Sequence, residues 1–113
     1  MLDHAKLDVY HRALDLLQEI DGIMQLMPAG RSHLRDQLDR AATSIVLNIA
    51  EGAGEFSKAD KQRFYRMARR SATEVAAILD ILDRRGAVAV EAIGQARDVL
   101  TRIVAMLVRL AMK

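Results

Sequence analysis

A chain of 113 residues is long enough for one domain and short for two, so we expect a single domain over residues 1–113. Apolar residues make up 51%, charged residues 28%, and cysteine is absent. This composition excludes a disordered tail, a disulfide scaffold, thiolate metal sites and a cysteine nucleophile. The net charge of +2 is small, so total charge alone predicts no partner.

Residues that favour helices dominate the sequence, and residues that break helices gather at Pro28–Gly30, Gly52–Gly54 and Gly86. Between these breaks, apolar residues recur every three or four positions, which is the period of an amphipathic helix. Helices are expected over residues 8–27, 32–52, 57–85 and 90–112, with Ser32 and Ser57 as the N-caps of the second and third. Because the connections are short, the sequence predicts an all-α, antiparallel, up-down-up-down four-helix bundle.

The second expected helix is apolar nearly all round in its middle. It carries no charge from Ala41 to Ala50, and Val46 and Leu47 point away from its main apolar stripe in different directions. A helix of this kind is normally covered on every side, whereas the other helices of a small bundle cover one face. We therefore expect Val46 and Leu47 to lie in an interface between copies of the chain.

Positive charge concentrates on the third expected helix, which has six cations and one anion between Ser57 and Arg70. We expect Tyr65 to lie among these cations on the solvated side of the helix. The expected inner side consists of Phe64, Met67, Ala68, Ser71, Ala72, Val75, Ile78, Leu79 and Leu82. Guanidinium groups suit phosphates, and the shortage of aromatic side chains favours contact with a nucleic-acid backbone over base readout. The alternative is an ordinary solvated helix surface. The candidate nucleic-acid-binding residues are Lys58, Lys61, Arg63, Arg66, Arg69, Arg70 and Arg84.

A ridge of polar residues follows the second helix at steps of three and four and meets two polar positions of the third. One interpretation makes Asn48, Glu51 and Glu74 a ligand site or an acid/base cluster. The favoured interpretation is that the group forms internal hydrogen bonds and fixes the register of the bundle, because buried polar groups need partners. The ridge consists of Gln37, Arg40, Ser44, Asn48, Glu51, Ser71 and Glu74.

No pattern in the sequence indicates catalysis, a metal or a cofactor. Glu51 and Glu74 lack the histidine three positions on that di-iron bundles require. Ser44 and Ser71 lie within expected helices, away from any histidine in the sequence, and not on the strained turn of a hydrolase. The glycines at positions 52 and 54 follow a helix, not a strand, which argues against a phosphate loop. Acidic residues near the start and the lack of a long apolar run predict a cytoplasmic protein without membrane contact.

The segment Leu38–Gly52, LDRAATSIVLNIAEG, resembles the core of a bacterial four-helix-bundle family encoded in intervening sequences of large-subunit (23S) rRNA. The pairs Arg63–Phe64 and Met67–Ala68, the segment Ser71–Glu74 and the early stretch Leu7–Ala13 fit the same pattern. That family is also similar to the accessory variability determinant of diversity-generating retroelements. The resemblance implies a homopentamer of bundles packed side by side, with no catalytic residues to carry over. In the retroelement relatives it implies nucleic-acid binding through a basic surface.

Together these features predict a non-enzymatic, homo-oligomeric bundle that binds RNA or DNA weakly, with little sequence preference, through the basic side of the third helix. The alternative is a structural or protein-interaction oligomer that binds no nucleic acid and docks a protein partner. A small-molecule enzyme built around Asn48, Glu51 and Glu74 is the third hypothesis.

Overall fold

The computed structural model describes residues 2–112, so the first and last residues of the expected domain, Met1 and Lys113, lie outside the described residues. Within residues 2–112 the chain is all-α, with four helices and no strand. The elements are a 3₁₀ turn η1 (Asp3–Lys6) and the helices α1 (Asp8–Leu26), α2 (Ser32–Ala53), α3 (Lys58–Arg84) and α4 (Val90–Met112). The prediction of four helices is confirmed, and their ends fall within one residue of the expected positions. The η1 turn was not expected.

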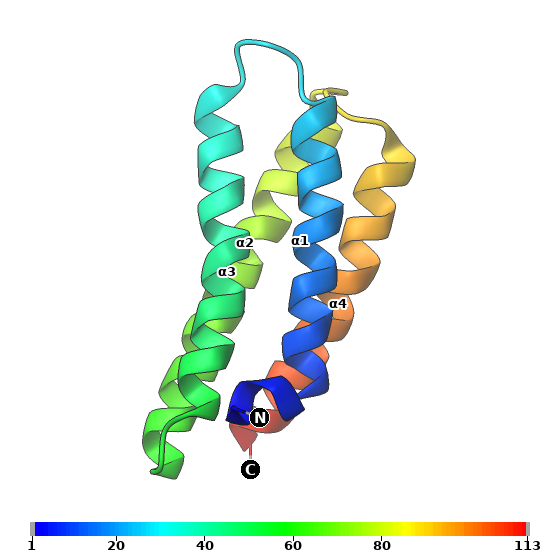
Figure 1. Cartoon of the computed structure of the whole chain (residues 1–113). Coiled ribbons are helices and arrows are strands. Elements are labelled where there is room, and N and C mark those ends of the chain that lie inside the picture. The colour runs from blue at the N-terminus through cyan, green and yellow to red at the C-terminus, as the bar shows by residue number, and fades with distance from the viewer. Residues whose placement is uncertain (1, 113) are drawn as a thin grey trace.

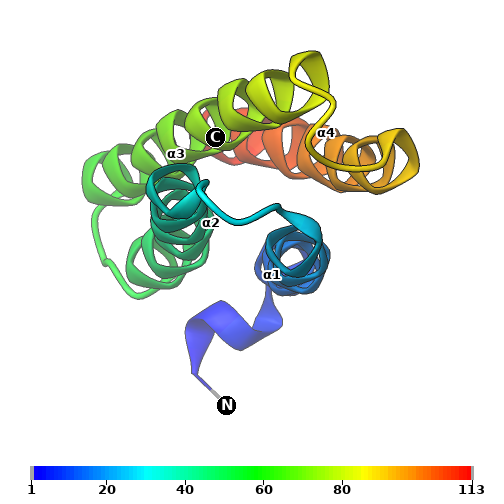
Figure 2. The same ribbon diagram turned by 90° about the horizontal axis from the view of Figure 1, so that it is seen from above.

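Each of the four helices lies beside two others. Each packs against its neighbours along the chain, and α1 closes the bundle against α4 (Figure 2). Within the described part of the chain, the backbones of the diagonal pairs α1–α3 and α2–α4 do not lie side by side, and their side chains meet in one core. Consecutive helices run antiparallel, which places the α2–α3 connection at the same end of the bundle as η1 and the end of α4 (Figure 1). The molecule is 44 Å long, close to the length of the 27-residue α3.

The buried line of α3 matches the expected inner side at Ala68, Ala72, Val75, Ile78, Leu79 and Leu82 and differs from it only in the first turns of the helix. It follows alternating steps of three and four, a seven-residue repeat that keeps one side of the helix facing α2 and α4. Tyr65 lies on this line and is buried, whereas Phe64 is half-buried and Met67 is exposed. The prediction of an exposed Tyr65 and a buried Met67 is therefore wrong. The line consists of Tyr65, Ala68, Ala72, Val75, Leu79 and Leu82.

Gly52, in the last turn of α2, allows α2 and α3 to approach closely. A Cβ atom at this position would lie 2.8 Å from Cε1 of Tyr65 and 3.0 Å from Cβ of Phe64. The Tyr65 ring is rigid and buried, so it has little room to move aside. Gly52 was expected at the helix end, but the structure places it inside the helix as a packing position.

We expect Gly52→Ala to lower the free energy of unfolding by about 1–2 kcal/mol. Overpacking against the tyrosine ring costs about 1–3 kcal/mol, and the better helix propensity of alanine offsets up to about 1 kcal/mol. The matched control is Gly94→Ala in α4, where no atom lies within 4 Å of the added carbon. It should raise the free energy of unfolding by about 0.5–1 kcal/mol. Urea denaturation of both variants measures the difference, and equal effects would contradict the packing role of Gly52.

The middle of α2 is better covered than its composition predicts. Val46 is only 7% exposed and belongs to the core of its own chain. The expectation that Val46 stays exposed in a single chain is therefore wrong. The outer side of α2 gains cover from η1, which packs against α2 as well as α1. Leu47 is 55% exposed and is the one uncovered residue of the charge-free stretch.

One of the two expected N-caps is confirmed. The Ser57 hydroxyl accepts the backbone N–H of Asp60 at 3.1 Å and caps α3. Ser32 is the first residue of α2, and Arg31 occupies the N-cap position in its place. No helix of residues 2–112 is long and apolar enough to cross a lipid bilayer.

Candidate nucleic-acid interface

Four exposed arginines lie within two turns of the first half of α3: Arg63, Arg66, Arg69 and Arg70. We call this group the arginine surface. The group spans about 10 Å of the helix axis, because seven residues rise by 1.5 Å each. The opposite side of the same turns carries the buried Ala68 and Ala72, so the core fixes which way the arginines face.

The arginine surface is not neutralised by carboxylates. Among residues 2–112, none of its four side chains forms an ion pair with an acidic side chain. The far end of α3 is different, because Arg97 of α4 contacts Asp80 at 2.8 Å and Asp83 at 3.3 Å. These contacts, above all the hydrogen bond to Asp80, raise the pKa of Arg97 above its ordinary value. One end of α3 is thus balanced in charge, while the other is positive.

Arg63 is held in place by an aromatic ring. Its guanidinium carbon lies 4.6 Å from the centroid of the Phe64 ring, within the range of a cation–π contact. This contact uses one face of the guanidinium plane. The N–H groups at the edge of the plane stay available to phosphate oxygens, which bind arginine in that plane.

Two of the candidate cations have other surroundings. The Lys61 amine donates to the backbone oxygens of Ala53 at 2.9 Å and Gly52 at 3.4 Å, so it satisfies carbonyl groups at the end of α2. This side chain is half-buried, and its charge is already used within the chain. Arg84 is exposed but lies fourteen residues beyond Arg70, about 21 Å along the helix. Lys58, in contrast, is exposed at the start of α3 and extends the arginine surface toward the α2–α3 connection.

The exposed aromatic residue near the cations is Phe56, and not Tyr65 as expected. Tyr65 is buried, and burial raises the pKa of its phenol. Phe56, which the sequence reasoning missed, is fully exposed in the connection between α2 and α3. A residue just before an N-cap normally packs on an apolar residue five positions on, and that position here is Lys61. This mismatch is the sequence signal that predicts an exposed ring.

The polar ridge forms a smaller cluster than expected. Asn48 donates through Nδ2 to the backbone oxygen of Ser44 at 2.9 Å and to its hydroxyl at 3.0 Å. The hydroxyl of Ser71 donates to that of Ser44 at 2.9 Å and joins α3 to α2.

The other residues of the polar ridge stay outside this network. Glu51, Glu74 and Arg40 are exposed and form no hydrogen bond with its members. Gln37 is half-buried and precedes Ser44 by seven residues, about two turns of α2. The three bonded residues act in packing, and the structure does not bring the two glutamates into an acid/base cluster with them.

We expect Asn48→Ala to lower the free energy of unfolding by about 1–3 kcal/mol, because it removes two hydrogen bonds from a buried position and leaves a gap. The control is Glu51→Ala three residues on, which is exposed and should change stability by less than about 0.5 kcal/mol. Thermal and urea unfolding followed by circular dichroism compare the two. If Asn48→Ala is as stable as the control, the cluster does not contribute to packing.

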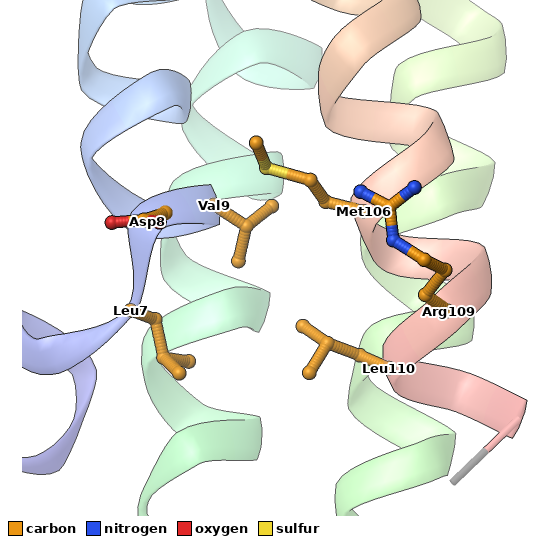
Figure 3. Close-up of a pocket in the computed structure, with 6 residues that line it drawn as sticks. All are labelled: Leu7, Asp8, Val9, Met106, Arg109 and Leu110. Carbon is orange, nitrogen blue, oxygen red and sulfur yellow. The ribbon is translucent and has the colours of Figure 1, made fainter.

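Other hollows lie outside the arginine surface. One of 230 Å³ lies between the start of α1 and the end of α4 (Figure 3). Its walls are apolar, with Asp8 and Arg109 as the only charged residues.

Among the described residues no group of three His, Cys, Asp or Glu side chains is placed to hold a metal ion. His11 donates a hydrogen bond through Nε2 to the Ala5 carbonyl oxygen at 2.8 Å, and the His4 ring packs on Tyr10. Both histidines thus connect η1 to α1.

The fold and this surface define a small helical-bundle protein with a one-sided positive surface on its third helix. The chain belongs to the family of 23S rRNA-intervening sequence proteins, which its residues 5–109 match. It is also similar to a crystal structure of a protein of unknown function from the S23 ribosomal protein family of Bacteroides thetaiotaomicron. That similarity has 22% sequence identity and a TM-score of 0.85 over 93% of this chain and 99% of the other, and it establishes the fold. No curated protein matches the sequence.

Proposed function

We propose that this protein is a non-enzymatic, cytoplasmic, homo-oligomeric bundle that binds RNA or DNA weakly through the arginine surface. The observation that carries the proposal is that Arg63, Arg66, Arg69 and Arg70 are exposed together without acidic partners among residues 2–112. Keeping four like charges within about 10 Å is unfavourable unless a polyanion or its counterions neutralise them. The family description refers to 23S rRNA, which makes RNA the first probe to use.

The proposed mechanism is phosphate neutralisation with release of counterions. For a single strand, the logarithm of the binding constant falls with the logarithm of salt concentration at about 0.7 per neutralised phosphate. Four contacts therefore predict an affinity loss of about 50-fold between ~50 mM and ~200 mM salt. Fluorescence anisotropy of labelled RNA and DNA at these two concentrations tests the proposal. Absence of binding at the lower concentration, or binding that ignores salt, would refute it.

Self-association is the second part of the proposal and depends on Leu47. This leucine lies beside a hollow of 430 Å³ that is otherwise lined by polar and charged residues of α2, including Ser44, Asn48 and Glu51. A half-exposed leucine within a polar rim is typical of a contact between proteins. The number of five copies follows the family resemblance. An oligomer repeats the arginine surface and strengthens binding through multiple contacts.

A second candidate function is a structural or protein-interaction oligomer without nucleic-acid binding. The same exposed Leu47 favours it, because an apolar contact does not require a nucleic acid. The anisotropy experiment separates the two functions. A protein that assembles but binds neither RNA nor DNA at low salt fits the second function and excludes the first.

A further inference from the structure

Phe56 is an exposed aromatic ring with no partner within the described chain. It lies in the short connection between α2 and α3, next to the N-cap Ser57, and the helices leave it fully exposed. A phenylalanine can bury more than about 150 Å² on contact with a partner. Exposure of the whole ring at a loop therefore indicates a contact surface more strongly than an exposed aliphatic residue on a helix does.

The ring borders a hollow of 240 Å³ that combines apolar walls with cations. Tyr65 and Leu110 line it together with Gln62 and Lys61, whose amine binds carbonyl oxygens of α2, and the exposed Lys58 adds positive charge. The carboxylates nearest in sequence, on Glu55 and Asp60, do not line this hollow. Its volume lies below the range of about 300–1,000 Å³ that is typical of sites for whole ligands, so it suits a single ring system.

The hollow and the arginine surface both lie on the first half of α3. Lys58 lines the hollow, and Arg70 closes the arginine surface twelve residues later, about 18 Å along α3. A line of cations with an aromatic ring at its end is the arrangement of proteins that bind single strands, in which the backbone follows the charges and a base stacks on the ring. Bases in a duplex are already stacked on both faces and cannot take this position.

We propose that Phe56 stacks on an unpaired base of single-stranded RNA or DNA whose backbone runs along the arginine surface. This inference rests on the proposed nucleic-acid binding and specifies its form: a single strand is preferred to a duplex. Lys58 neutralises the phosphate beside the stacked base. Stacking tolerates any base, so sequence preference stays low.

Affinity for single strands and duplexes tests the inference. Phe56→Ala should weaken binding of a labelled oligouridine or oligothymidine by about 5- to 100-fold and leave binding of a duplex of equal length unchanged. Phe56→Tyr should retain the wild-type affinity, because it keeps an aromatic ring. The matched control is Val90→Ala, an exposed apolar position at the opposite end of the bundle, which should change neither affinity. The wild-type fold should persist in every variant, since Phe56 is fully exposed and Val90 is 62% exposed.

A spectroscopic signal gives a second measurement. The chain contains no tryptophan, so Phe56→Trp introduces a single tryptophan at the ring position. Addition of the oligonucleotide should quench its emission, whereas anionic phospholipid vesicles should leave it unchanged. A response to vesicles alone would assign the ring to a membrane surface and overturn the inference.

The two proposals fail in different ways. If wild-type protein binds single strands in a salt-dependent manner but Phe56→Ala binds equally well, the stacking role is wrong and the arginine surface stands. If wild-type protein binds no nucleic acid at low salt, both proposals are refuted. If Phe56→Ala instead lowers the mass of the assembly, the ring belongs to an interface between copies and not to a nucleic-acid site.

Discussion

Replacing Arg63, Arg66, Arg69 and Arg70 together by glutamate is expected to weaken binding of RNA and DNA by about 100-fold or more at low salt. The four contacts that release counterions disappear, and four like charges then repel the phosphates. The fold should persist, since all four side chains are exposed and glutamate is about as good a helix former as arginine. Anisotropy with labelled oligonucleotides measures the loss, and circular dichroism verifies the helix content.

A control variant with the same change in net charge separates position from total charge. Four exposed cations outside the arginine surface are suited to it: Lys6, Arg12, Arg85 and Arg102. Their replacement by glutamate should lower affinity by less than about 10-fold, because they act only at long range through a salt-screened field. Equal losses in the two variants would mean that binding follows net charge, and the arginine surface would have no special role.

Leu47→Asp is expected to convert the proposed assembly to single chains. In one chain this leucine is 55% exposed, so aspartate there does not disturb the bundle. In an interface between copies, an unpaired carboxylate costs several kcal/mol. Light scattering should give a wild-type mass that is a multiple of 12.6 kDa and a variant mass near 12.6 kDa.

The chain offers a close control for that experiment. Leu26, the last residue of α1, is 56% exposed, and Leu26→Asp adds the same charge at almost the same exposure. This variant should keep the wild-type mass. Wild-type protein that is already monomeric at micromolar concentration, or dissociation by both variants, would contradict an interface at Leu47.

The helices could be predicted from the sequence because local signals determine them. The breaks at Pro28–Gly30, Gly52–Gly54 and Gly86 and the apolar period between them predict each element to within one residue. The η1 turn gave no such signal, since four residues are too few to show a period. Its contact with α2 was therefore unforeseen, and so was the burial of Val46.

The candidate site was harder to predict because its details depend on which side chains the first turns of α3 bury and on contacts far apart in the sequence. The buried line of α3 passes through Tyr65, which removes the expected aromatic residue from the basic side. Counting charges did not distinguish Lys61, whose amine binds carbonyl groups of α2, from Arg66, which is exposed. Nor did it predict that Asn48 bonds Ser44 while Glu51 stays in solvent, because that outcome depends on how α3 packs on α2.

The most direct test of the arginine surface follows the arginine side chains themselves. Nuclear magnetic resonance of the Nε–Hε groups, recorded during titration with a single-stranded oligonucleotide at low salt, reports on each guanidinium separately. The resonances of Arg63, Arg66, Arg69 and Arg70 are predicted to shift. Those of Arg97, held by Asp80 and Asp83, and of Arg35, which donates to the Met27 carbonyl oxygen, are predicted to stay in place. Shifts spread evenly over all arginines, or confined to residues outside α3, would contradict the account.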